Sequence, residues 1–163
     1  MVRPAKGRRH ALRLIRDLLA FTPDGTGTDV ASAIHFAFRV LPHRGVVILL
    51  SDFLAPDWDK PLTQLAARHD VTAVTVDDIG EQVPRGSGWV NFEDPESGLV
   101  SLVDLGDPGV RRRWTTIARA RTEERNQRLR SAGVRHLAID VGEDYAPVLR
   151  KAFAPKRRPG RRR

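Results

Sequence analysis

The sequence predicts an α/β fold, a Rossmann-like parallel sheet with flanking helices and an inserted β-hairpin. Short apolar runs of the strand type lie at residues 46–50, 71–76 and 134–140. Between them lie segments whose apolar residues recur at the 3.6-residue spacing of an amphipathic helix. Alternating strand and helix signals are typical of parallel strands joined by right-handed crossovers. We therefore expect a parallel core of three strands.

The elements before the second strand follow from periodicity and from helix-breaking residues. Helical spacing predicts helices over residues 9–21 and 30–41, and both are expected to pack on the core. Residues 46–50 form a continuous apolar run, as expected for a strand that is covered on both faces. A short helix around residues 62–66, with Asp59 as its expected cap, leads to the strand at 71–76.

The second half of the chain adds a hairpin, a long helix and a third strand. Segments 89–93 and 99–103 flank a turn rich in Pro and Gly at 94–98, which predicts a β-hairpin. Pro108 lies near the start of a long solvated helix that Gly133 closes, and a last helix is predicted at 145–153.

Three parallel strands leave an edge and a face of the sheet uncovered, so we expect the N-terminal strands of the fold to be missing. The exposed edge would allow self-association with a second copy. The predicted organisation is a partial domain at residues 1–154 and a basic disordered tail at residues 155–163.

Composition excludes several classes of protein. The chain has no cysteine, which excludes disulfides, thiolate metal sites and cysteine nucleophiles and suits the reducing cytoplasm. It has no apolar run of about 18 residues, so neither a membrane span nor a secretion signal is expected. We therefore expect a cytoplasmic protein.

The net charge of +8 is concentrated at the C-terminus. Six basic residues supply most of it: Lys156, Arg157, Arg158, Arg161, Arg162 and Arg163. A solvated, solubilising tail is the favoured interpretation, because binding to nucleic acid needs more than a run of charges. A nucleic-acid-associated protein acting through this tail is the alternative.

Candidate site residues follow from the rule that ligands of open α/β sheets gather at the carboxyl ends of the strands. The polar residues expected there are Ser51, Asp52, Asp77, Asp78 and Asp140. Thr28 precedes a predicted helix, and a hydroxyl together with the Asp52 carboxylate would suit Mg²⁺. The alternative is structural: Thr28 or Asp29 caps the helix, and Asp52 caps a loop.

Catalytic motifs are not evident. The loop at residues 25–28 lacks the spacing and the lysine of a phosphate-binding loop, and Ser51 lies in no Gly-x-Ser-x-Gly elbow. No two histidines on one predicted helix have metal-binding spacing. We expect a protein that is not an enzyme, and a small hydrolase based on the strand-end aspartates is the least supported alternative.

Several short motifs occur in a fairly specific order along the chain. They are Gly27-Thr28-Asp29, Ser51-Asp52-Phe53, Arg68-His69-Asp70, Val83-Pro84 and the turn Asp94-Pro95-Glu96-Ser97-Gly98. In this order the chain resembles domain-of-unknown-function family fifty-eight. Its members are similar to von Willebrand factor A domains and are often encoded beside MoxR-type AAA+ ATPases.

The resemblance implies a metal-ion-dependent adhesion site in which Thr28 and Asp52 are two of the ligands. The family's Asp-x-Ser-x-Ser loop is absent, so the chain resembles the C-terminal portion of a member, and Mg²⁺ binding is expected to be weak or absent. Residues 77–81 also depart from the Asp-Pro-Arg-Glu associated with the family. The implied function is a non-enzymatic adaptor that works with a MoxR-type AAA+ ATPase on an unknown client protein.

Overall fold

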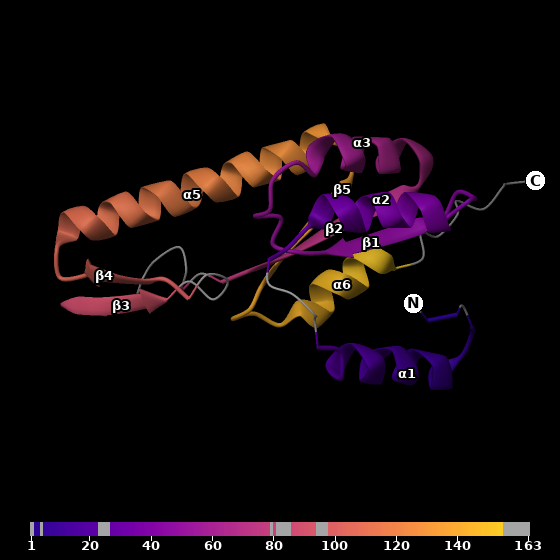
Figure 1. Cartoon of the computed structure of the whole chain (residues 1–163), viewed down its shortest axis with the longest axis horizontal. Helices are drawn as coiled ribbons and strands as arrows, with labels where there is room; N and C mark the ends of the chain where they lie inside the picture. The colour runs from indigo at the N-terminus through magenta and orange to yellow at the C-terminus, as the bar shows by residue number, and fades with distance from the viewer. Residues whose placement is uncertain are drawn as a thin grey trace, which may run out of the picture.

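A three-stranded parallel sheet forms the centre of the molecule. The computed structural model describes residues 2–3, 5–22, 27–78, 80, 86–93 and 98–154. The strands are β1 (Val46–Leu50), β2 (Asp70–Asp77) and β5 (Arg135–Asp140), in the order β1-β2-β5, and β2 pairs with both neighbours in parallel register (Figure 1). The predicted parallel α/β fold is confirmed.

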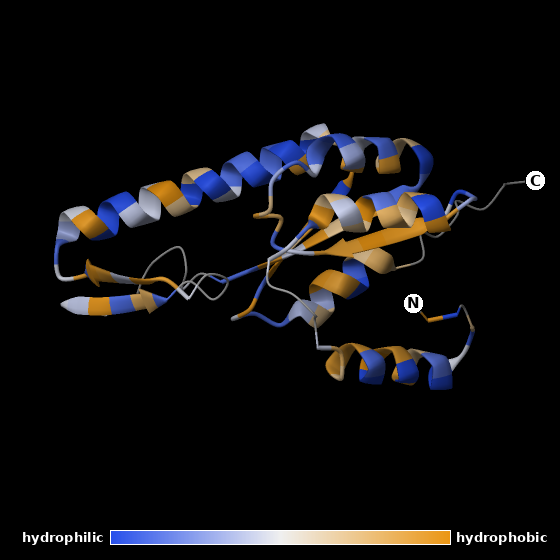
Figure 2. Cartoon of the chain, viewed as in Figure 1, coloured by the Kyte–Doolittle hydropathy of each residue, from blue (hydrophilic) through white to orange (hydrophobic). Residues whose placement is uncertain are grey.

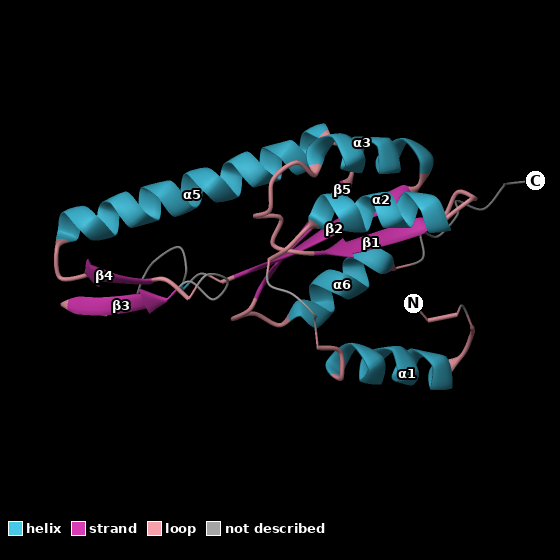
Figure 3. Cartoon of the chain, viewed as in Figure 1, coloured by secondary structure: helices cyan, strands magenta, loops and turns pink. Residues whose placement is uncertain are grey.

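Five helices are described around the sheet: α1 (Arg8–Leu19), α2 (Val30–Val40), α3 (Asp59–Arg68), α5 (Pro108–Ser131) and α6 (Tyr145–Phe153). Helices α2 and α3 lie on one side of the sheet together with the C-terminal end of α5, and α6 lies on the other side (Figures 1 and 3). No described helix is long and apolar enough to cross a membrane.

The hydrophobic core lies on the α2 and α3 side of the sheet. Ile34, Leu62 and Leu65 are fully buried there against side chains of β1 and β2. The burial of β1 alternates along the strand, so that Val47 is buried whereas Ile48 is 54% exposed. The expectation that β1 is covered on both faces is therefore wrong for the residues that the structure describes.

Helix α1 differs from the prediction in both length and packing. It ends at Leu19, because Ala20 serves as its C-cap. It buries none of its residues, and Leu18 is 75% exposed, although the apolar stripe predicted that this helix packs on the core. Figure 2 shows that α1 has apolar and polar residues on different sides and lies apart from the parallel sheet.

The N-terminus of α3 also corrects the sequence-based expectation. Trp58 occupies the N-cap position, and Asp59 is the first helical residue rather than the cap. The Asp59 carboxylate instead accepts a hydrogen bond from Arg128 Nε at 2.7 Å. The side-chain hydrogen bond from Arg128 lowers the pKa of Asp59 and so keeps its carboxylate charged.

The predicted hairpin consists of β3 (Trp89–Glu93) and β4 (Val100–Asp104), which pair antiparallel. It lies beside the N-terminal part of α5, away from the parallel sheet (Figure 1). The rings of Phe92 and Trp114 join hairpin and helix, with centroids 4.7 Å apart. The turn at 94–97 and the tail at 155–163, including the tail arginines singled out above, lie outside the described residues.

Candidate functional site

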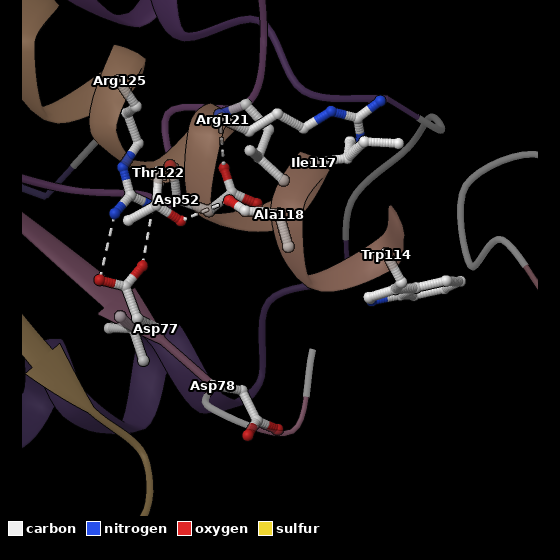
Figure 4. A pocket seen from close by; sticks show the side chains of 11 residues that line it. Asp52, Asp77, Asp78, Trp114, Ile117, Ala118, Arg121, Thr122 and Arg125 are labelled. Carbon is white, nitrogen blue, oxygen red and sulfur yellow. Dashed lines mark hydrogen bonds and ion pairs between the residues drawn. The ribbon is translucent and has the colours of Figure 1, made fainter. Parts of the chain in front are cut away.

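A cavity of about 480 Å³ opens at the carboxyl ends of β1 and β2. The strand ends form one wall and α5 forms the other (Figure 4). Its polar lining residues are Asp52, Asp77, Asp78, Arg121, Thr122 and Arg125. The structure therefore brings together three of the aspartates that sequence reasoning placed at this edge of the sheet. Asp140 is not among them, since it lines a separate apolar groove beside α6.

The loop after β1 holds Asp52 at the mouth of this cavity. The Asp52 carboxylate accepts the backbone N–H of Leu54 at 3.2 Å, and the Ser51 hydroxyl accepts the backbone N–H of Phe53 at 3.1 Å. Phe53 adopts a φ of 56°, which is unusual for a bulky residue. Its ring is buried edge-on against Trp58, so packing holds the loop in this conformation. Asp52 itself stays exposed.

Arg125 joins the two strand ends to α5. Its guanidinium donates to both carboxylate oxygens of Asp77, at 2.8 and 3.1 Å, and to the backbone carbonyl of Asp52 at 3.2 Å (Figure 4). The side chain of Arg125 is 7% exposed and that of Asp77 is 19% exposed. A bidentate pair of this kind satisfies most of the polar atoms that burial removes from water. Asp77 is therefore part of the scaffold of the site.

Sequence reasoning missed Arg125. The predicted helix is dominated by charged residues, so one more arginine carried no special signal. The signal that was present is its spacing: Arg125 lies four residues before Leu129, and the two residues share a face of α5. Both are buried in the structure.

His136 lies beside this ion pair. Its Nε2 atom is 3.0 Å from the hydroxyl of Thr75, which is fully buried. Burial lowers the pKa of His136 below its ordinary value, and the positive charge of Arg125 lowers it further. The imidazole is therefore neutral at pH 7, which avoids a second cation next to Arg125. In the structure this histidine contacts the hydroxyl of Thr75 rather than lining the cavity.

Thr28 and Asp29 lie at the start of α2. Figure 1 shows that α2 begins at the end of the sheet toward which the β1 arrow points, which is the edge that carries Asp52. The Asp29 carboxylate accepts the backbone N–H of Ser32 at 2.8 Å and caps α2. Two hydrogen bonds from Ser32 lower the pKa of Asp29, and the bond from the side chain has a larger effect than the bond from the backbone. The structural interpretation of Asp29 as a helix cap is confirmed.

Asp78 also has a local role, since its carboxylate accepts the backbone N–H of Gly80 at 2.7 Å. Among the described residues, no group of three His, Cys, Asp or Glu side chains is placed to hold a metal ion. Mg²⁺ prefers octahedral coordination by oxygen. The hydroxyl of Thr28 and the carboxylate of Asp52 are oxygens of the right chemistry, but two such oxygens do not complete the coordination of this ion.

Comparison with known proteins identifies the family. A family model described as "Protein of unknown function DUF58" matches residues 1–125. The chain belongs to this family. Uncharacterized proteins of Mycobacterium tuberculosis and Mycobacterium bovis are 31% identical to this DUF58 chain over 159 residues, covering 95% of the chain and 50% of each relative. The chain thus spans about half the length of these curated relatives.

A third DUF58 relative, an uncharacterized protein of Mycobacterium avium, is 32% identical over 162 residues. That match covers 96% of this chain and 94% of the relative. Among solved structures, an uncharacterized membrane spanning protein from Vibrio fischeri matches 89% of the chain and 63% of its own, at 14% identity and a TM-score of 0.22. A TM-score this low does not establish a common fold.

Proposed function

We propose that this DUF58 chain is a non-enzymatic protein-binding module of the metal-ion-dependent adhesion type. It would work with a MoxR-type AAA+ ATPase in the assembly or maturation of other protein complexes, in the cytoplasm. The observation that carries the proposal is the placement of Asp52, whose exposed carboxylate is held at the mouth of a cavity by a loop that is anchored through Phe53.

The environments of the two strand-end carboxylates favour binding over catalysis. Arg125 engages both oxygens of Asp77, so that carboxylate is poorly placed to ligate a metal or to take a proton from a substrate. Asp52 is bonded through one oxygen to the backbone of its own loop. A fixed and exposed carboxylate of this kind suits recognition of a partner or of a bridging cation.

A bound Mg²⁺ would supply the positive charge that attracts a carboxylate of the partner. Asp52 and Thr28 are the residues of this chain that would hold it. Two protein oxygens do not replace enough of the hydration shell of the ion for high affinity, so we expect the chain alone to bind Mg²⁺ weakly. The choice of a MoxR-type ATPase as partner rests on the family resemblance, and the unknown client protein belongs to the same proposal.

The test is retention of a purified MoxR-type ATPase by the immobilised chain, measured in Mg²⁺ and in EDTA. Asp52→Asn removes the charge and keeps the acceptor for the N–H of Leu54, so the loop is preserved. We expect retention in Mg²⁺ to fall about tenfold, equivalent to about 1.4 kcal/mol. The same measurement is made on the longer Mycobacterium tuberculosis relative, with its residue at the position of Asp52 changed.

The matched control is Asp140→Asn. Asp140 ends β5 and accepts the backbone N–H of Gly142 at 2.8 Å, so it has the same kind of turn as Asp52 but does not line the cavity. Its substitution should leave retention unchanged. Equal retention of the wild-type chain and the Asp52→Asn variant, or retention that ignores EDTA, would contradict the proposed function.

A further inference from the structure

We propose that the arm, defined as β3, β4 and residues 108–121 of α5, is a docking surface for an acidic protein segment. This inference rests on the proposed function, because the arm forms one wall of the cavity that contains Asp52. It adds a second contact surface and the chemical character of the partner segment that binds there, which the proposed function does not specify.

The position of the arm is set by the anchoring of α5. The helix has 24 residues, and its buried residues, Arg125 and Leu129, lie in its last third. The preceding part extends away from the parallel sheet, with the hairpin alongside it (Figure 1). Trp114, Ile117 and Arg121 line the cavity from this part of the helix. Any protein that reaches Asp52 in the cavity would therefore also meet the arm.

The arm carries an excess of positive charge. Helix α5 contains eight arginines and two glutamates. Three arginines near its C-terminal end have carboxylate partners, namely Asp77, Asp59 and Glu123. The remaining five form no ion pair with any described residue, and all are exposed on the arm: Arg111, Arg112, Arg113, Arg119 and Arg121. Complementary charge on a partner would be acidic.

Three of these arginines are consecutive and lie close to the N-terminus of α5. Arg111, Arg112 and Arg113 lie in the first turns of α5, where the helix dipole is positive, and the first turn holds no acidic residue. The nearby Asp107 uses its carboxylate to accept the N–H of Gly109 at 2.6 Å. The Asp107 carboxylate is one negative charge beside these three arginines, so positive charge exceeds negative charge in residues 107–113.

The apolar residues of the arm favour a protein partner over nucleic acid. Trp89 is 68% exposed, Leu102 is 61% exposed and Ile117 is 53% exposed. Tryptophan and arginine are enriched in protein interfaces, and buried aliphatic contacts support them there. An acidic protein segment with some apolar residues fits both the charges and the exposed surface.

The test measures binding of a fluorescent peptide rich in Glu and Leu to the full chain, at low and at physiological salt. The comparison probe is a single-stranded oligonucleotide of the same net charge. The arm variant is Arg112→Glu/Arg113→Glu/Arg119→Glu. The matched control is Lys6→Glu/Arg8→Glu/Arg9→Glu, which changes the net charge equally at three exposed positions near α1. Far-ultraviolet circular dichroism verifies that each variant is folded.

We expect the arm variant to weaken peptide binding about tenfold at low salt, which is at the lower end of the effects of electrostatic steering. The control variant should change peptide binding less than about twofold. Equal weakening by both variants would overturn the inference, since net charge would then explain the binding. Tighter binding of the oligonucleotide than of the peptide would overturn it too. Peptide binding through the arm should persist in EDTA and in Asp52→Asn, so the arm and the proposed cation site can fail separately.

Discussion

The two faces of the parallel sheet differ in how much their side chains are exposed at β1. On one face, α2 and α3 cover Val47, and their residues Ile34 and Leu65 are fully buried. On the other face, Ile48 and Leu50 of the same strand are 54% and 68% exposed. They line an apolar groove of about 630 Å³ beside α6. Residues of one continuous apolar run therefore have different environments, decided by which helices lie above them.

From this difference we infer that the covered face stabilises the fold, whereas the open face is available for contact with another protein. The covered face contains the core, and the ion pair of Arg125 with Asp77 closes it at the strand ends. The open face keeps a contiguous apolar surface in contact with water, which is typical of a site for another protein surface. Substitutions on the two faces should therefore have unequal effects on the free energy of unfolding.

The largest expected effect compares two leucines, one for each face. Leu65→Ala should lower the free energy of unfolding by about 4 kcal/mol, because a fully buried leucine leaves a cavity. Leu50→Ala makes the same chemical change at an exposed position and should lower it by about 0.5 kcal/mol. Urea denaturation measures both. Similar losses would show that the open face is covered in solution.

The next effect concerns the ion pair at the end of the covered face. Arg125→Met should lower the free energy of unfolding by about 3 kcal/mol, because it leaves the Asp77 carboxylate largely buried without its partner. Adding Asp77→Asn should recover part of this loss, since the uncompensated charge is removed. Arg130→Met breaks an exposed pair with Glu123 and should have little effect. If the double variant loses as much free energy of unfolding as Arg125→Met alone, the unpaired buried charge of Asp77 is not the cause of the loss.

The smallest effect is a dependence on pH through His136. Burial, with the charge of Arg125, holds its folded pKa below the ordinary 6.5, so the unfolded chain binds a proton at higher pH than the folded chain. Stability should be fully present above pH 6.5 and should fall as the pH decreases below it. His136→Gln should reduce the difference in unfolding free energy between pH 7.5 and 5.5. An unchanged difference in this variant would contradict the assignment of the pH dependence to His136.

Most of the fold was predictable because the relevant interactions are local. Helical spacing, short apolar runs and turn residues identified the described helices and strands, and their order along the chain indicated the parallel sheet. The coverage of β1 was not predictable in this way, since a run such as 46–50 is the same whether one face or both are covered. The amphipathic pattern of α1 likewise indicates a helix but does not show what its apolar side packs against.

The site was predictable in position and only partly in composition. Chain topology places Asp52, Asp77 and Asp78 at the strand ends, and the structure brings them to one cavity. Arg125 lies 48 residues after Asp77, and Arg128 lies 69 residues after Asp59. No local pattern signals contacts at such separations, so sequence reasoning placed Asp77 among the candidate site residues at the strand ends and Asp59 at a helix cap.

Helix α5 also has a mechanical consequence. At 1.5 Å per residue, its tip at Pro108 lies about 25 Å from Arg125, which bonds to both strand ends. A helix of this length is stiff, so a force applied at the hairpin would be converted into torque about the ion pairs of Arg125 and Arg128. The backbone carbonyl of Asp52, held by Arg125, lies at the pivot. Displacement of the hairpin would thus reach the loop that carries Asp52 through the hydrogen bond of Arg125.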